Sequence, residues 1–143
     1  MNVLHLVGRI FFGMIFVFNG LNHFMRLDML TDYAASMGVP APSVAVIITG
    51  LLLLLGGLAV IFGYQRRFGL WMLIIFLIPV ALIMHPFWAV PAEQQMAQMS
   101  HFFKNFALAG GAMMLLLNLD RAWPYSLGGS SGGNVGGTEA DVG

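Results

Sequence analysis

The feature that most constrains this chain is the stretch 44–62, which is almost wholly apolar and contains no charged residue. A helix of about 20 apolar residues crosses the roughly 30 Å hydrocarbon core of a bilayer. Three other stretches have a similar character, so the predicted spans are about 3–24, 44–62, 68–84 and 101–119. Backbone groups in lipid must hydrogen-bond within their own segment, which favours helices. We therefore expect an all-α integral membrane four-helix bundle.

The overall composition agrees with lipid as the main solvent of this chain. Hydrophobic residues make up 59% of the 143 residues and charged residues only 8%, whereas a soluble domain carries about 25% charged residues. The net charge is zero, so no basic stripe points to a nucleic-acid partner. The sequence has no cysteine, which excludes disulfides, iron–sulfur clusters and cysteine zinc sites.

The chain is expected to divide into a four-span membrane domain, 1–126, and a Gly/Ser-rich tail, 127–143, which is predicted to be disordered. The first span is predicted to be a permanent helix, because it carries Arg9 and lacks a small-residue cleavage motif. After Pro91, an amphipathic segment is expected to lead into the fourth span. Between the first two spans, helical spacing of apolar residues predicts a short helix at the membrane surface, formed by Leu27, Leu30, Tyr33, Ala34 and Met37.

Basic residues indicate how the spans are oriented. Four spans place the amino terminus, the loop between the second and third spans, and the carboxyl terminus on one side. This side has Arg66, Arg67 and Arg121, while the other side has Arg26 and Lys104. Cytoplasmic loops carry an excess of Lys and Arg. We therefore expect both termini to lie in the cytoplasm, in a multi-pass protein of a bacterial-type inner membrane.

Polar side chains within the spans fall into two layers, of which the inner one is small. It consists of Arg9 on the first span and of Asn118, Asp120 and Arg121 at the end of the fourth. Ionisable groups in a span normally face the bundle interior or an interface. Two interpretations stay open: Arg9 pairs with Asp120 or Asn118 as a structural contact, or it extends to a lipid phosphate at the membrane surface.

The outer layer is richer and involves three spans. Three polar side chains lie at i, i+3 and i+4 near the end of the first span, so they share one helix face. The same spacing recurs at the start of the fourth span, and a histidine ends the third. Because the first and fourth spans run in opposite directions, the two sets are expected at equal depth. The candidate ligand-binding residues of this outer cluster are Asn19, Asn22, His23, His85, His101, Lys104 and Asn105.

Three interpretations of the outer cluster stay open. As a structural seam, its amides and imidazoles would join helices, each hydrogen bond contributing about 1 kcal/mol or less in a membrane. As a ligand site, Lys104 and a histidine would contact the oxygens of a quinone or lipid head group, while Phe24, Phe102 and Phe103 hold its apolar part. A metal or haem site would use the three histidines, but haem and copper are not expected. We expect the cluster to form the only polar concavity of the bundle.

Two motifs in the first and fourth spans are similar to those of a known family. The first span contains Gly8-Arg9-Ile10, followed by Gly20 and the polar pair Asn22-His23. The fourth begins with His101-Phe-Phe-Lys104-Asn105 and continues as an apolar run that includes Gly111. Over about residues 4–120, the chain resembles the DoxX family of small four-helix membrane proteins.

The resemblance implies a redox-associated accessory role, linked to quinones, without catalytic activity of its own. A quinone or a lipid is the expected ligand, and the lipid bilayer and other membrane protein subunits are the expected partners. The alternative is a non-catalytic structural subunit of a larger respiratory or other energy-transducing membrane complex. A standalone transporter is a third option, disfavoured by the few charges within the spans and by the lack of an evident internal repeat.

Overall fold

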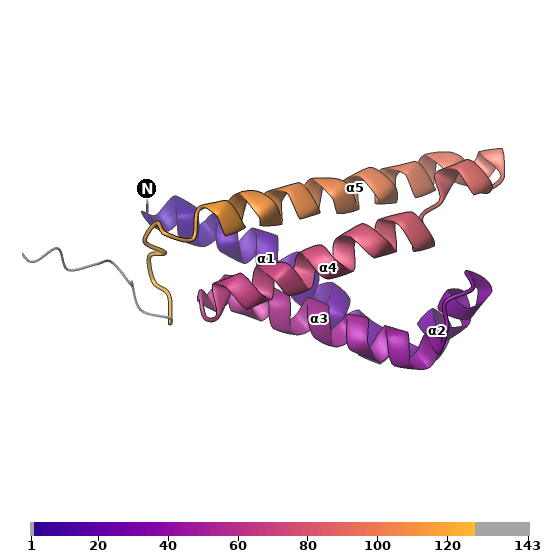
Figure 1. Cartoon of the computed structure of the whole chain (residues 1–143), viewed down its shortest axis with the longest axis horizontal. Helices are drawn as coiled ribbons and strands as arrows, with labels where there is room; N and C mark the ends of the chain where they lie inside the picture. The colour runs from indigo at the N-terminus through magenta and orange to yellow at the C-terminus, as the bar shows by residue number, and fades with distance from the viewer. Residues whose placement is uncertain (1, 128–143) are drawn as a thin grey trace, which may run out of the picture.

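The computed structural model of the chain describes residues 2–127, and every regular element in this part is helical (Figure 1). In chain order the elements are α1 (Asn2–Met25), α2 (Leu27–Ser36), α3 (Pro42–Phe62), α4 (Arg66–Met84), the 3-10 turn η1 (Phe87–Ala89) and α5 (Ala92–Leu117). The predicted all-α class is confirmed. The tail 127–143, predicted to be disordered, lies outside the described residues apart from Leu127.

The helix boundaries follow from local chemistry. α3 begins at Pro42, whose ring holds φ near the helical value, and it is followed by Gly63 with a φ of 65°. A Cβ atom at Gly63 would also lie 2.5 Å from the Cβ of Ser126, so conformation and space both require glycine there. α5 begins directly after Pro91. The amphipathic lead-in and the predicted fourth span therefore form one continuous helix.

The helices pack in the order α1, α3, α4, α5, and the predicted short helix is present as α2, which packs on α3. The α1–α3 contact is close because glycines face backbone atoms. A Cβ at Gly20 would lie 2.8 Å from the amide nitrogen of Leu54, and a Cβ at Gly57 would lie 2.8 Å from the carbonyl oxygen of Gly13. Small residues of this kind allow membrane helices to approach one another. By contrast, α1 and α5 make almost no close backbone contact.

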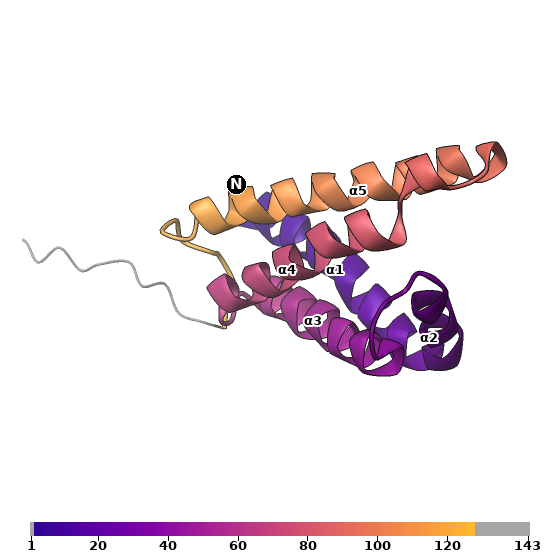
Figure 2. The same cartoon turned by 45° about the vertical axis from the view of Figure 1, so that its right-hand side comes forward.

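The two ends of the molecule differ in character. The start of α1, the α3–α4 turn and the end of α5 lie together at one end (Figure 1). We call this the arginine end, because these segments carry Arg9, Arg66, Arg67 and Arg121. The opposite end, which we call the α2 end, contains α2, and there the start of α5 diverges from α2 and α3 (Figure 2).

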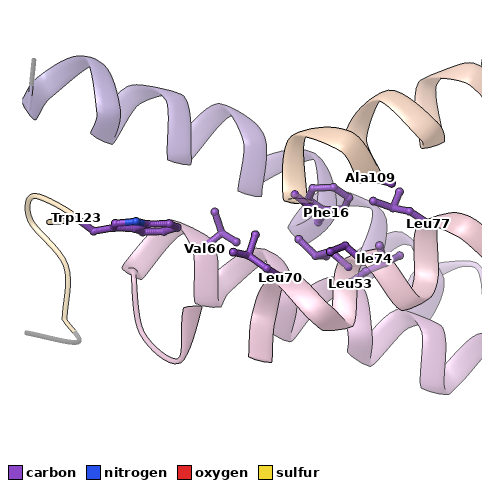
Figure 3. Close-up of a cluster of buried hydrophobic side chains, with 10 residues drawn as sticks. Phe16, Leu53, Val60, Leu70, Ile74, Leu77, Ala109 and Trp123 are labelled. Carbon is purple, nitrogen blue, oxygen red and sulfur yellow. The ribbon is translucent and has the colours of Figure 1, made fainter. Parts of the chain in front are cut away.

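A continuous apolar core joins α1, α3, α4 and α5. Phe16, Leu53 and Leu77 are at most 2% exposed, and Ala109 supplies the contact from α5. Figure 3 shows these side chains together, with Trp123 placed further along toward the arginine end. Trp123 follows α5 in the chain and is 4% exposed, so the segment after α5 folds back onto the bundle.

Within residues 2–127, three segments are long and apolar enough to cross a membrane: Asn2–Met25, Pro42–Phe62 and Arg66–Ala89. α5 is less apolar than these, because polar side chains occupy its first half from Glu93 to Asn105. Large apolar side chains such as Phe11, Met14 and Ile75 are exposed on the outer faces of the helices. Such faces suit contact with lipid chains, which are as apolar as the side chains themselves.

Candidate functional site

The outer cluster surrounds a cavity of about 270 Å³, which we call the outer cavity. Its walls come from α1, α2, α3, α4, α5 and the residue that follows α4. Asn22 is not part of the lining, although it shares a helix face with the others. The remaining six candidate residues all line this cavity: Asn19, His23, His85, His101, Lys104 and Asn105.

On the α1 side, His23 is held in one tautomer by its own helix. Its Nδ1 atom lies 2.8 Å from the backbone carbonyl oxygen of Asn19. A carbonyl oxygen can only accept, so Nδ1 carries the proton and Nε2 is left as an acceptor. The Asn19 amide donates to the carbonyl of Ile15 at 2.7 Å. His23 therefore presents a preset acceptor to the outer cavity, while Asn19 is partly occupied by its own helix.

On the opposite side, the two other histidines and the lysine form a connected group. His85 and His101 stack with ring centroids 5.0 Å apart and an angle of 22° between planes. His85 Nδ1 lies 2.8 Å from Oε1 of Gln98. The Lys104 ammonium donates to Nδ1 of His101 at 3.2 Å, which leaves the His101 proton on Nε2. Lys104 is exposed, so it lies at the mouth of the cavity and keeps donors to spare.

Asn105 is the most enclosed polar residue of the outer cavity. It is 7% exposed, and its side-chain amide makes no hydrogen bond within residues 2–127. Its amide atoms are nevertheless not among the fully buried, partnerless side-chain atoms of residues 2–127, so they open onto the cavity. Asn105 therefore offers a vacant donor and acceptor to anything that enters the cavity.

The helix α2 closes the cavity through Tyr33. The Tyr33 hydroxyl donates to the carbonyl oxygen of Met84 at 3.0 Å and so links α2 to the end of α4. Tyr33 and Phe76 line the cavity together with the predicted residues, although neither was selected as a site residue from the sequence. The helical spacing of 27–37 indicated that α2 exists, but nothing in it indicated a contact with α4.

A second cavity of about 310 Å³ adjoins the first and is mainly apolar. Its own walls include Leu52, Ile75, Pro79 and Ile83, and its polar members are His23, Tyr33 and Thr49. Thr49 donates to the carbonyl oxygen of Ala45 at 2.7 Å within α3. The two cavities share six lining residues: His23, Leu30, Tyr33, Phe76, Val80 and Met84. The two cavities therefore adjoin along these shared residues, one with several polar groups in its wall and the other mainly apolar.

The aromatic residues expected to hold the apolar part of a ligand lie elsewhere. Phe102 and Phe103 pack against Phe87, with ring centroids 5.3 and 6.3 Å away, and Phe24 lies beside Gly50. None of the three lines the outer or the apolar cavity. The prediction was wrong because helical spacing gives the face of one helix, whereas the direction of that face depends on which helix packs beside it.

The three histidines line one cavity but do not converge on one point. Stacked rings such as those of His85 and His101 present their faces to each other, whereas metal ligation uses a nitrogen lone pair in the ring plane. Within residues 2–127 no group of three His, Cys, Asp or Glu side chains is close enough to hold a metal ion.

The inner layer differs from what was expected. Arg9 is 2% exposed, and its Nη2 donates to the backbone carbonyl oxygen of Tyr125 at 3.3 Å rather than to a side chain. Asn118 donates to the carbonyl of Met114 in its own helix, and Asp120 lines a different cavity with Arg66. Because the segment after α5 folds back, a backbone carbonyl takes the place expected for Asp120 or Asn118.

The outer cavity is also not the only polar concavity. A cavity of about 680 Å³ at the arginine end is lined by His5, Arg9, Asn118 and Arg121 among others. We call it the inner cavity. It lies between α1 and the end of α5, so both polar layers of the sequence border cavities between these two helices.

The long apolar helices identify the chain as a small helical membrane protein. It contains two adjoining cavities, one with polar groups in its wall and one mainly apolar. The DoxX family model matches residues 4–86, which is more than half of the chain, and the protein belongs to the DoxX family. The match ends before α5, so it does not include the similarity at His101–Gly111.

The chain is also similar to an Escherichia coli (strain K12) protein named inner membrane protein YphA. The two are 29% identical over 115 residues, which cover 80% of this chain and 82% of the relative. No solved structure matches the chain. The predicted location in a bacterial-type inner membrane is confirmed by the family, the relative and the three apolar helices.

Proposed function

We propose that this DoxX protein binds a quinone or a lipid head group in the outer cavity, as part of a redox-associated accessory role. The observation that carries the proposal is the amide of Asn105, which makes no hydrogen bond within residues 2–127 and opens onto the cavity that Lys104 and His23 also line. A ligand oxygen would supply the partner that the amide lacks within residues 2–127. A hydrogen bond of this kind would contribute about 0.5–1.5 kcal/mol to binding.

The groups around the outer cavity suit the head of a quinone in both oxidation states. The Lys104 ammonium and the Asn105 amide can donate to carbonyl oxygens, and Nε2 of His23 can accept from a hydroxyl group. A quinone offers only acceptors, while its reduced form also offers donors. No carboxylate from the described part of the chain lines the cavity, so its charge favours an uncharged or anionic head group over a cationic one.

The adjoining apolar cavity suits the first part of a hydrocarbon tail. Small-molecule sites are commonly concave, mostly apolar and about 300–1,000 Å³ in volume, with a few placed polar groups. The apolar cavity of about 310 Å³ next to the outer cavity matches this description. Phe76 and Tyr33 belong to both cavities and would contact the ligand where the head meets the tail.

The proposal includes a topology of four spans with both termini in the cytoplasm. α5 packs along α4 and has an apolar second half, from Phe106 to Leu117, which supports its role as the fourth span. The gathering of arginines at one end supports a cytoplasmic position for that end. The outer cavity then lies in the outer half of the membrane.

The test uses the full chain purified in a mild detergent. Quinones and lipids are extracted from the wild type, from Lys104→Met and from Asn105→Leu, and are quantified per folded protein by mass spectrometry. We expect the wild type to retain a quinone or lipid and each variant to retain at least about tenfold less, which corresponds to about 1.4 kcal/mol of binding free energy.

Asn22→Leu is the matched control, because Asn22 lies one helical turn from Asn19 but outside the cavity lining. It should retain ligand like the wild type. Equal retention in the wild type, Lys104→Met and Asn105→Leu would contradict the proposal. Lys104 is exposed, so Lys104→Met tests binding even if Asn105→Leu alters folding.

A structural subunit of a larger membrane complex is the second candidate. The observation that favours it is the set of large apolar side chains exposed on the outer faces of the helices, such as Phe11, Met14 and Ile75, which a helix of another subunit would cover. The same purification distinguishes the two functions. A stable set of partner chains that survives Lys104→Met would favour the subunit, and a chain that purifies alone with its ligand would favour the binding protein.

A further inference from the structure

The inner cavity contains a buried positive charge that the described chain does not neutralise. Arg9 is 2% exposed, yet Nε and Nη1 have no hydrogen-bond partner within residues 2–127. Its single hydrogen bond is to the uncharged carbonyl of Tyr125. A charged side chain inside a membrane costs at least about 2.5–3.5 kcal/mol on insertion scales unless it is paired.

Aromatic contacts around Arg9 only partly offset this cost. The guanidinium of Arg9 lies 5.6 Å from the ring centroid of Trp123, and the guanidinium of Arg66 lies 5.0 Å from the same ring. The His5 ring meets Trp123 edge to face at 5.3 Å. A cation over an aromatic ring gains about 0.5–2 kcal/mol, but the ring brings no negative charge. Two arginines around one neutral ring therefore raise the local positive potential.

The walls of the inner cavity also carry more positive than negative charge. Arg121 lines the cavity together with Arg9, and Asn118 lies one turn before it, but no carboxylate from residues 2–127 is among the lining residues. Asp120, the acidic residue of this segment, lines a separate cavity with Arg66 and Arg67. The volume of about 680 Å³ is large enough for a head group. The positive charge of the walls and the volume of the cavity both favour a bound anion.

The position of the cavity indicates that the anion is part of a lipid. α1 and α5 border the cavity but make almost no close backbone contact. Gly8 adds no side chain on the α1 side, and a Cβ there would meet nothing within 4 Å. Apolar walls from Phe12, Met114 and Leu115 continue from the polar groups. A molecule with a phosphate group and hydrocarbon chains fits a cavity whose polar wall is followed by apolar walls.

We infer that the inner cavity is a second site, at the arginine end, which binds the phosphate oxyanion of an anionic phospholipid head group. Arg121 contacts the phosphate as an exposed, charge-assisted donor. Arg9 supplies fixed positive charge from the cavity wall, and Met114 and Leu115 contact the start of the acyl chains. This site is independent of the outer cavity and its ligand.

The test measures binding to the full chain in detergent by native mass spectrometry and thermal stability. The probes are phosphatidylglycerol, diacylglycerol with the same chains, and inorganic phosphate. We expect phosphatidylglycerol to bind and to raise the melting temperature, and the two other probes to have little effect at matched concentration. Arg121→Gln should weaken phosphatidylglycerol binding at least about fivefold, a change of about 1 kcal/mol.

Arg67→Gln is the control, since it removes the same charge at the same end but outside the inner cavity. It should bind phosphatidylglycerol nearly as the wild type does. Equal weakening by both variants would overturn the site, because the effect would then be general attraction to the arginine end. A diacylglycerol response equal to that of phosphatidylglycerol would also overturn it, and an equal response to inorganic phosphate would overturn the lipid as the source of the anion.

Discussion

The hydroxyl group of Tyr33 donates a hydrogen bond to the backbone carbonyl oxygen of Met84, 3.0 Å away and 51 positions further along the chain. This contact ties α2 to the end of α4, where both the outer and the apolar cavity have their walls. It makes α2 a cover over the proposed ligand site rather than a simple connection between α1 and α3.

Tyr33→Phe should weaken the attachment of α2 to α4 without leaving a gap in the cavity wall, because the ring remains and only the hydroxyl group is lost. A hydrogen bond of this kind contributes about 0.5–1.5 kcal/mol. We expect faster amide hydrogen exchange in α2 and faster loss of bound quinone or lipid. Tyr64→Phe is the control, because Tyr64 is exposed and lines neither cavity. Unchanged exchange in α2 of Tyr33→Phe would show that the bond does not hold α2.

Asn105→Leu distinguishes a ligand site from a structural seam by the sign of its effect on stability. The Asn105 amide makes no hydrogen bond within residues 2–127, so replacing it with an apolar group of similar size breaks none. The melting temperature of the delipidated protein should then stay the same or rise, while ligand retention falls. A clear decrease in melting temperature would instead mean that Asn105 joins helices together.

Gly20→Ala should separate α1 from α3. Its Cβ would lie 2.8 Å from the Leu54 backbone nitrogen, and forced overpacking of this kind costs about 1–3 kcal/mol. Gly110→Ala is the matched control in α5, because a Cβ there meets nothing within 4 Å and alanine favours the helix by up to about 1 kcal/mol. Unfolding in dodecyl sulfate gives both values, and equal stabilities of the two variants would contradict the close α1–α3 contact.

Reporter fusions test the four-span topology. Fusions after Tyr64, after Glu93 and after Leu127 should report the cytoplasm, the opposite side and the cytoplasm, because in the proposed topology α4 and α5 each cross the membrane once between these points. α5 is the less apolar of the two, so the third fusion is the decisive one. The same side for Glu93 and Leu127 would mean that α5 does not span the membrane.

The sequence alone was enough to predict the helices and to place polar residues of the first and last helices at one level. Apolar length decides where a membrane helix lies, since lipid leaves backbone groups no other partner. A constant rise per residue then sets depth along the axis, so His23 and Asn105 on antiparallel helices could be expected at one level. Both line the outer cavity.

Only the tertiary structure decided which surfaces meet. Helical spacing does not say which neighbour a face will contact, so the sequence could not predict that α1 packs on α3 rather than on α5. Nor could it predict that Arg9 bonds the Tyr125 carbonyl or that Tyr33 bonds the Met84 carbonyl. Every residue carries a carbonyl oxygen, so the sequence does not show which of them will accept a side-chain hydrogen bond. The position of that acceptor follows from the path of the folded chain.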